Sequence, residues 1–438
     1  MTFQHADLVE VVAWGRTVGA ILEDPDRSGL YVFEYDPDWV SAGVELSPIH
    51  MPNRDAVAYE FPNLDRHTFL GLPGLFADAL PDRFGNALVD RRLADLGVSP
   101  QSITPLDRLA YAGDRSLGAL EFRPPLDRGT ADPTAIELAD LVVASRGLIA
   151  GTLGTDDDAT TALAQLISVG TSPGGARAKA VVAFDPGTGQ IRSGHGAHAP
   201  GFEPWLIKLD GVTNRGALGA SDGSGRVEFA YYRMATAAGI EMADSRLHVE
   251  HDRAHFMTKR FDRAEAAADP DRAASTSAKI HIQTLCGLAH LDFNMNGAHG
   301  YAQYLQVIDQ LGLGYPAREQ GFRRAVFNVA AANRDDHTKN LSFRTHPDGR
   351  WDLAPAYDLT HVHAPGVGHR MSVNGKTDRI TRADLGALAD RQGVGSADSI
   401  IDEVLAAVER WMEFAEEGGV PRATALAIDD DLRAVLPG

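Results

Sequence analysis

The first part of the chain, through about residue 125, opens with apolar runs that are typical of short β-strands separated by turns. The stretches VVAWGRTVGAILED (residues 11–24) and GLYVFEYD (residues 29–36) are rich in β-branched and aromatic residues, and PDRSG between them favours a turn. A helical period follows in LPGLFADALPDRFGNALVDRRLADLG (residues 72–97). We therefore predict a small β-rich domain with a helical tail over residues 1–125, and a linker between residues 124 and 134.

The middle of the chain, residues 135–265, has the pattern of a sheet with helices. After a helix around TAIELADLVVASRGLIAG, strands are expected at LISVG, AVVAF, PWLIKLD, SRLHVE and HFMTKRFD, with one helix at GRVEFAYYRMATAAG. Short strands separated by turn signals such as DPGTG indicate a mostly antiparallel sheet.

The last part, residues 266–438, has apolar residues at three- to four-residue intervals and is predicted to be helical. The period is clear in YAQYLQVIDQLGLG, GFRRAVFNVAAAN and SIIDEVLAAVERWMEFAEEGG. The alanine- and aspartate-rich stretch AEAAADPDRAASTSA before them is expected to be an exposed loop. The chain thus has an α+β pattern with three regions.

Composition and charge narrow the choice of function. Sixty acidic against forty-one basic residues leave the 438-residue chain with a net charge of −19, which disfavours direct contact with nucleic acid or anionic membranes. The single cysteine, Cys286, cannot form an internal disulfide, and the start MTFQHADLVEVVAWG has no leader pattern. No apolar run approaches the roughly eighteen residues of a membrane span. We predict a cytoplasmic protein.

The stretch AANRDDHTKNLSF, residues 331–343, concentrates polar chemistry after an apolar helix. Its side chains Asp335, Asp336, His337 and Asn340 are expected in a loop. The turn signal HPDG and the segment WDLAPAYDL predict a hairpin that returns Asp358 toward Asn340. Oxygen ligands from Asn340 and Asp358 would suit Mg²⁺ beside nucleotide phosphates, and Asp335 would orient a hydroxyl.

The spacing D-x-x-x-x-N is that of the protein-kinase catalytic loop, but alone it is a weak signal. For an isolated match, the favoured explanation is that the two aspartates cap a turn and the asparagine satisfies the backbone. The glycine-rich TSPGGARAK could let the backbone approach an anion, or could be an ordinary turn. Ala176 follows Gly175 where a P-loop needs lysine, which disfavours a Walker ATPase.

Two upstream residues strengthen the kinase interpretation. Lys208 lies in the apolar strand PWLIKLD, where an unpaired charge is costly, and Glu228 lies in the next helix among apolar neighbours. A strand lysine and a helix glutamate form the ion pair that positions ATP phosphates in kinases. Alternatively, Lys208 would lie on an edge strand in solvent, and Glu228 would lie on a solvated helix face.

Taken together, these motifs resemble the HipA-like serine/threonine kinases over most of the chain. The resemblance rests on LPGLFADALPDRFG, SPGGARAK, WLIKL, VEFAYYRMATAAGI, KRFDR, NRDDHTKN and LAPAYDL. It implies a two-lobed protein-kinase-like fold preceded by a small β-rich domain, with ATP and Mg²⁺ between the lobes. It implies Asp335 as catalytic base, Asn340 and Asp358 as metal ligands, and Lys208 on the phosphates with Glu228 as its partner.

The resemblance also assigns roles to other residues. Lys259 and Phe261 would face adenine through their backbone, and His337 would belong to the D-x-H-x-x-N loop. Ser172 would be autophosphorylated, although Ser168 and Thr171 are close enough to compete. The phosphate loop would contain Gly170, Ser172, Gly174 and Gly175. HIQTLCGLAHLD lacks the acidic residues expected beside a peptide site, and neither His281 nor Gln283 receives a role.

Three functions remain open from the sequence. The first is an ATP-dependent kinase with a protein substrate, acting as the toxin of a toxin-antitoxin pair and contacting DNA only through a helix-turn-helix antitoxin. The second is a non-catalytic regulatory binding subunit, against which the intact constellation counts. The third is a metal-dependent phosphohydrolase, which would use Asp335, Asp336, His337, Asp358, His361 and His363.

Overall fold

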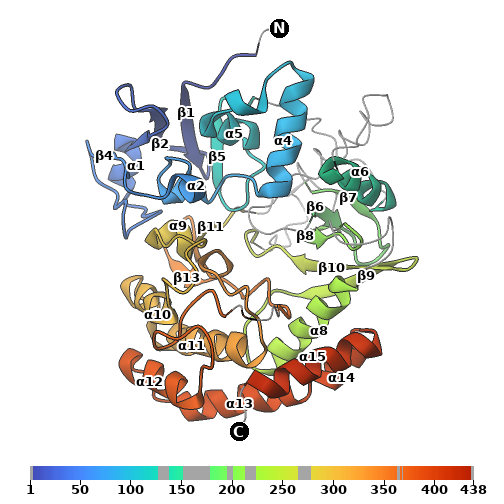
Figure 1. Cartoon of the computed structure of the whole chain (residues 1–438). Helices are drawn as coiled ribbons and strands as arrows, with labels where there is room; N and C mark the ends of the chain where they lie inside the picture. Colours follow the sequence, from blue (N-terminus) through green and yellow to red (C-terminus); the bar gives the residue numbers. More distant parts are fainter. Residues whose placement is uncertain are drawn as a thin grey trace.

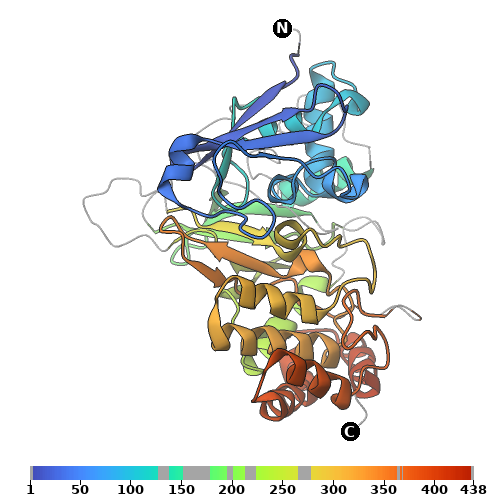
Figure 2. The same ribbon diagram turned by 90° about the vertical axis from the view of Figure 1, so that its left-hand side faces the viewer.

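A computed structural model shows three units stacked along the long axis of the molecule (Figure 1). The N-terminal β-rich unit lies at one end, the second sheet lies beside and below it, and the C-terminal helices form the opposite end. Figure 2 shows the same order from the side. The structure describes residues 3–126, 138–150, 178–194, 201–212, 223–264, 278–362, 366 and 368–435.

The N-terminal unit is built on an antiparallel five-stranded sheet of order β4-β3-β2-β1-β5. Alternating residues of its strands, such as Val9, Val11 and Phe33, are buried beneath the helices. The strands are β1 (Leu8–Ala13), β2 (Arg16–Glu23), β3 (Tyr31–Tyr35), β4 (Ala58–Tyr59) and β5 (Leu120–Arg123). The helices are α1 (Pro37–Ala42), α2 (Arg66–Phe69), α3 (Gly74–Ala77), α4 (Arg83–Asp95), η1 (Pro100–Ser102) and α5 (Pro105–Ala112).

The predicted helical tail over residues 72–97 is two helices rather than one. Helix α3 ends before Pro81, whose missing N–H and ring disfavour a helix interior. Asp82 then caps the start of α4, because its carboxylate accepts a hydrogen bond from the N–H of Gly85 at 2.8 Å. The two aspartates of FADALPD lie on either side of this break, Asp78 at the end of α3 and Asp82 at the start of α4.

The second unit contains the antiparallel sheet β7-β6-β8-β10-β9, which confirms the predicted antiparallel arrangement. Gly225 of α8 lies so close to β10 that a Cβ there would meet the carbonyl oxygen of Ala254 at 2.0 Å. Phe84 and Leu88 of α4 share a core with this sheet. The elements are α6 (Leu138–Ala150), β6 (Lys179–Phe184), β7 (Ile191–Ser193), β8 (Glu203–Lys208), α8 (Ser224–Ala237), β9 (Ser245–Glu250) and β10 (Arg253–Lys259).

The third unit is mainly helical, but it also contains a small sheet of order β11-β12-β13. The predicted hairpin at LSF and WDL forms β12 and β13, whereas the pairing of β11 was not foreseen. The strands are β11 (His281–Thr284), β12 (Ser342–Thr345) and β13 (Trp351–Leu353). The helices are α9 (Leu285–Ala289), α10 (Tyr301–Gln310), α11 (Gly314–Ala330), η2 (Thr338–Asn340), α12 (Arg382–Gln392), α13 (Ala397–Glu409), α14 (Trp411–Glu417) and α15 (Arg422–Val435).

The predicted α+β architecture is therefore confirmed: a sheet-based lobe and a helical lobe follow a small β-rich domain. The proposed borders at 1–125, 135–265 and 266–438 stay predictions, because residues 127–137 and 265–277 lie outside the described part. None of the helices in the described ranges is long and apolar enough to cross a bilayer.

Candidate active site

A cavity lies where the three units meet, and six residues that the sequence singled out line it: Lys208, Glu228, Lys259, Phe261, Asn340 and Asp358. Its lining includes Leu75, Asp78 and Leu117 from the N-terminal unit, Lys179, Lys208, Glu228, Lys259 and Phe261 from the sheet lobe, and Lys339, Asn340, Tyr357 and Asp358 from the helical lobe. The N-terminal domain thus forms part of the wall, which the sequence did not predict.

Lys208 is held by two carboxylates on different elements. Its ammonium group bonds Glu228 of α8 and lies 2.5 Å from Oδ1 of Asp358. Glu228 is buried with 2% exposure, so the solvated-face alternative is wrong, and Lys208 is buried as well. A charged side chain at such a depth requires these partners. The lysine–glutamate pair that the sequence predicted is therefore present.

The charge of Asp358 is fixed by its surroundings. Burial alone would raise the pKa of this carboxyl, but Lys208 and Lys179 outweigh burial and hold the pKa well below its ordinary value. Asp358 also adopts the left-handed backbone conformation (φ 57°), which aspartate tolerates better than most residues. The carboxylate is ionised at neutral pH and faces the cavity.

Lys179 is a functional candidate that the sequence analysis missed. It is the first residue of β6 and the direct cross-strand partner of Lys208 in β8, so the two lysines lie on the same face of the sheet. Burial lowers the pKa of Lys179, and the carboxylate of Asp358 opposes this shift. The available signal was the lysine at the end of GGARAK, directly before an apolar strand.

The loop after α11 brings Asp335, His337 and Asn340 together as predicted. The side-chain amide of Asn340 donates to the backbone carbonyl of Asp335 at 2.8 Å, and the N–H of His337 donates to the same carbonyl at 2.9 Å. The phenol of Tyr357 donates to the carbonyl of Lys339 at 2.7 Å, which joins this loop to the segment before Asp358. The predicted return of Asp358 toward Asn340 therefore occurs.

Asp335 remains half-exposed, with 45% of its side chain accessible. Burial raises the pKa of its carboxyl, and the nearby charge of Asp358 adds to this, while His337 and Arg370 act in the opposite direction. Burial lowers the pKa of His337, whose Nε2 lies 3.9 Å from Oδ1 of Asp335. A carboxylate with an open side and raised basicity is suited to accept a proton from a hydroxyl.

Asp336 does not lie in an open loop as expected, because it is buried with 2% exposure. Its carboxylate accepts hydrogen bonds from the hydroxyl of Tyr301 at 2.7 Å and the N–H of Arg370 at 2.8 Å, and pairs with Nδ1 of His369 at 3.0 Å. The neighbour of Asp335 is therefore an anchor within the helical lobe.

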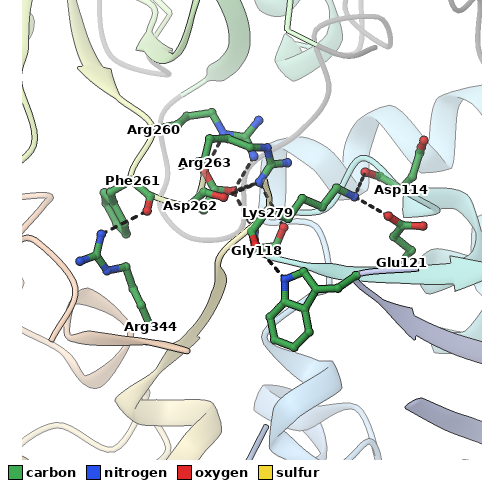
Figure 3. A network of polar contacts seen from close by, with 10 residues as sticks. Asp114, Gly118, Glu121, Arg260, Phe261, Asp262, Arg263, Lys279 and Arg344 are labelled. Atoms are coloured by element: carbon green, nitrogen blue, oxygen red, sulfur yellow. Dashed lines mark hydrogen bonds and ion pairs between the residues drawn. The ribbon is translucent and has the colours of Figure 1, made fainter. Parts of the chain in front are cut away.

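The segment between the lobes is fixed to the N-terminal domain, as Figure 3 shows. Asp262 accepts hydrogen bonds from Arg260 at 2.8 Å, from Arg263 at 2.7 Å and from the N–H of Gly118 at 2.8 Å. Burial would raise the pKa of Asp262, but the two guanidinium groups outweigh burial and lower it. The β5 end of the N-terminal unit thus holds the interlobe segment.

A second set of contacts in the same region starts from Lys279 (Figure 3). Its ammonium donates to Glu121 at 2.9 Å and to the carbonyl of Asp114 at 3.2 Å. The indole of Trp14 donates to the carbonyl of Lys279 at 2.8 Å. Asp262 and Lys279, which form contacts on either side of residues 265–277, are therefore both bonded to the N-terminal domain.

Lys259 and Phe261 line the cavity where adenine was expected. The side chain of Lys259 bonds Glu203 at 3.1 Å, and the carbonyl of Phe261 accepts a hydrogen bond from Arg344 at 3.3 Å. The Phe261 ring lies 5.8 Å from that of Tyr357. The N–H of Lys259 donates to the carbonyl of Asp244 at 2.8 Å, so the predicted backbone contacts with adenine stay a prediction.

Two aspartates of the N-terminal domain reach the same region. Asp78 accepts hydrogen bonds from the N–H and hydroxyl of Thr284 at 2.7 and 2.8 Å, and a Cβ on Gly287 would lie 2.3 Å from it. Burial raises the pKa of Asp78 to about 6 against the opposing charge of Lys339, and it raises the pKa of Asp82 to about 6 against the opposing charge of Lys179. Asp78 of the N-terminal domain thus contacts the segment HIQTLCGLAHLD at Thr284.

Two family models match the sequence. Residues 171–412 match the HipA-like C-terminal domain, and residues 9–123 match the HipA N-terminal domain. The first match alone spans more than half of the chain. This chain belongs to the HipA family.

The fold agrees with this assignment. HipA of Shewanella oneidensis MR-1, solved in a complex with HipB and its operator DNA, superimposes with a TM-score of 0.64 at 16% identity, over 97% of this chain and 96% of that chain. Helicobacter pylori proinflammatory kinase CtkA gives a TM-score of 0.31 at 10% identity, over 53% and 87%, which is too low to support an argument. A comparison with curated proteins found no match.

Some predictions for this HipA-family chain concern residues outside the described part. These are Gly170, Ser172, Gly174 and Gly175, together with Ser168 and Thr171. The phosphate loop and its autophosphorylated serine therefore stay predictions. His281 of β11 lines the cavity, and Gln283 donates to the hydroxyl of Ser47 in the N-terminal domain at 3.3 Å.

The phosphohydrolase alternative finds no support in the geometry. Within the described ranges, no three histidine, cysteine, aspartate or glutamate side chains are arranged to hold a metal. His361 lies 3.1 Å from Asp431 of α15, and His363 is outside the described residues.

Proposed function

We propose that this HipA-family protein transfers the γ-phosphoryl group of Mg·ATP to a serine or threonine hydroxyl of a protein. One observation carries the proposal: Lys208, Glu228 and Asp358 are bonded together in the same cavity that Asn340 lines. This is the set of groups that kinases place around nucleotide phosphates and their metal.

The residues present fit Mg²⁺ and a nucleotide. The ionised Asp358 and the side-chain oxygen of Asn340 are hard ligands, and Lys208 with Lys179 supplies cations for phosphate oxygens. When bound, Mg²⁺ would neutralise charge that develops on the β- and γ-phosphates. Lys259 and Phe261 would enclose the base, and Asp335 would orient the acceptor hydroxyl and take its proton.

Incubation of purified protein with γ-labelled ATP and cell lysate tests the proposal. We expect labelled serine and threonine in lysate proteins, and no label with Asp335→Asn. A wild-type protein that binds Mg·ATP but labels nothing would instead favour the regulatory-subunit hypothesis, and one that binds no nucleotide would exclude the kinase.

We further propose that the chain is a toxin partnered by a small helix-turn-helix antitoxin. Family membership and the HipB–DNA complex of the Shewanella neighbour support this. The net charge of −19 favours DNA contact through the partner only. A gel shift with DNA upstream of the coding sequence should require the co-expressed antitoxin. A shift by the chain alone would contradict the proposal that DNA is contacted only through the partner.

Autophosphorylation at Ser172 is part of the proposal. A phosphate adds about −1.5 to −2 charges to a loop that is meant to hold ATP phosphates, so we expect inactivation. Mass spectrometry after incubation with ATP would locate the phosphate. A phosphate only on Ser168, Thr171 or another residue would refute the assignment.

A further inference from the structure

Arg370 places a cation beside the proposed catalytic base. Its Nε lies 3.9 Å from Oδ1 of Asp335, and the two side chains are 35% and 45% exposed. In the described part of the chain, the basic groups within 4 Å of the Asp335 carboxylate are Arg370 and His337. Of these two, only arginine carries its charge at every physiological pH.

The position of Arg370 is fixed on two sides. Its N–H donates to Oδ1 of the buried Asp336 at 2.8 Å, and its guanidinium bonds the side chain of Asn296. Its carbonyl accepts a hydrogen bond from the N–H of Gly297 at 2.8 Å. Asp336, which follows Asp335 in the sequence, therefore positions Arg370 beside Asp335.

The other cations of the site have different neighbours. Lys208 is bonded by Glu228 and Asp358, and the ammonium of Lys339 lies 4.7 Å from the centre of the Phe293 ring. These lysines line the cavity between the lobes, whereas Arg370 lies on the side of Asp335. In the proposed reaction the acceptor hydroxyl approaches Asp335, and the guanidinium of Arg370 lies 3.9 Å from that carboxylate.

We propose that Arg370 is a further catalytic residue, whose guanidinium binds the oxygens of the γ-phosphoryl group during transfer. The inference rests on the proposed kinase function. The acceptor oxygen forms a bond to the γ-phosphorus, the bond from that phosphorus to the β–γ bridging oxygen breaks, and its electron pair stays on ADP. The hydroxyl proton passes to the carboxylate of Asp335.

Negative charge spreads over the three equatorial oxygens in this step, and a planar guanidinium can bond two of them at once. An arginine in such a position contributes about 10³–10⁵ to the turnover rate of other phosphoryl-transfer enzymes. Because the contact forms fully only in the transition state, it should affect kcat rather than nucleotide binding.

The test compares Arg370→Met and Arg370→Lys with the wild type in full-length protein. Transfer from γ-labelled ATP to lysate proteins gives kcat and the KM for Mg·ATP, and binding of a non-hydrolysable Mg·ATP analogue shows that each variant is folded. Arg382→Met is the matched control, because this exposed guanidinium pairs with Asp398 and Asp402 of another helix.

We expect Arg370→Met to lower kcat at least 100-fold, with KM and analogue affinity within about threefold of wild type. Arg370→Lys should recover part of the rate, and Arg382→Met should match the wild type. A kcat of Arg370→Met within threefold of wild type, or a loss confined to KM, would overturn the inference. If the wild type labels nothing, the proposed kinase function fails as well. If the wild type is active and Arg370→Met is equally active, only the role of Arg370 fails.

Discussion

The ammonium of Lys208 in β8 lies 2.5 Å from the carboxylate of Asp358, which is 150 residues further along the chain. Glu228 binds the same ammonium from α8. One cation therefore joins the sheet lobe to the helical lobe at the point where both would meet nucleotide phosphates.

Lys208→Ala is expected to weaken Mg·ATP binding about 10- to 100-fold, because one charge-assisted contact worth roughly 1.5–3 kcal/mol is lost. It should also lower the free energy of unfolding by about 3–5 kcal/mol, since Glu228 and Asp358 would lose their shared partner. Isothermal titration and urea denaturation measure the two effects.

Lys376→Met is a suitable comparison, because Lys376 pairs with a single aspartate, Asp384, and is half-exposed. Its loss should change stability by less than about 1 kcal/mol and leave nucleotide affinity unchanged. Nucleotide binding that survives intact in Lys208→Ala would show that this lysine does not contact the phosphates.

Asp335→Asn and Asp358→Asn should separate catalysis from binding. Asp335 is placed to accept a proton, so its amide variant should keep Mg·ATP affinity and lose activity by orders of magnitude. Asp358 is placed to hold metal and Lys208, so its variant should lose both. Calorimetric titration with Mg·ATP and the labelling assay give the two quantities.

Near-wild-type activity of Asp335→Asn would mean that Asp335 is not the catalytic base. Equal losses of nucleotide affinity in both variants would contradict the separate roles. The two substitutions are isosteric, so a thermal melt serves as the control for folding.

The sequence predicted the parts of the site whose geometry is local. Asp335 and Asn340 belong to one loop, and a hairpin with a clear turn signal carries Asp358 back to it. Lys208 and Glu228 could be predicted because a charge in an apolar strand requires a partner. Each of these inferences depends on residues that are close in the sequence or that are joined by one short loop.

What escaped prediction depends on packing between distant segments. Lys179 joins the site through strand register, and Arg370 reaches Asp335 through the buried Asp336. The positions of Asp78 and Asp82 near the site follow from docking of the N-terminal domain, which no local pattern encodes. The break at Pro81 could have been predicted, because proline disfavours a helix interior.

Asp262→Asn should strongly destabilise the protein, because Arg260 and Arg263 would lose the carboxylate between them. Removal of one member of a buried ion network costs about 3–5 kcal/mol. The lowered pKa of Asp262 means that its contribution is complete above the unfolded pKa near 4 and is lost as pH falls through the folded pKa. Urea denaturation at pH 7 measures the loss.

Asp252→Asn provides the control for this variant, since Asp252 is exposed in the turn between β9 and β10. Its effect should stay within about 0.5 kcal/mol. If Asp262→Asn is equally mild, the contacts of Figure 3 do not brace the interlobe segment.

Asp82→Asn should give a variant whose relative stability depends on pH. Burial raises the pKa of Asp82 from 3.8 to about 6, and one of its oxygens, Oδ2, has no hydrogen-bond partner among the described residues. Asparagine caps a helix as well as aspartate does, so the bond to Gly85 can persist. The substitution therefore removes the charge and keeps the cap.

The sign follows from proton binding. Below about pH 4 the carboxyl is protonated in both the folded and the unfolded state, and above about pH 6 the folded state must hold a buried charge. The contribution of Asp82 to wild-type stability thus falls as pH rises from about 4 to about 6, by at most about 3 kcal/mol at 1.36 kcal/mol for each pKa unit. The free energy of unfolding of Asp82→Asn minus that of wild type should rise over this interval and then level off.

Denaturation at pH 4.5, 6 and 7.5 would show this rise. Asp65→Asn is the control, because it makes the same change at an exposed cap of α2. If the difference in unfolding free energy is constant with pH, burial does not raise the pKa of the Asp82 carboxyl in the folded protein.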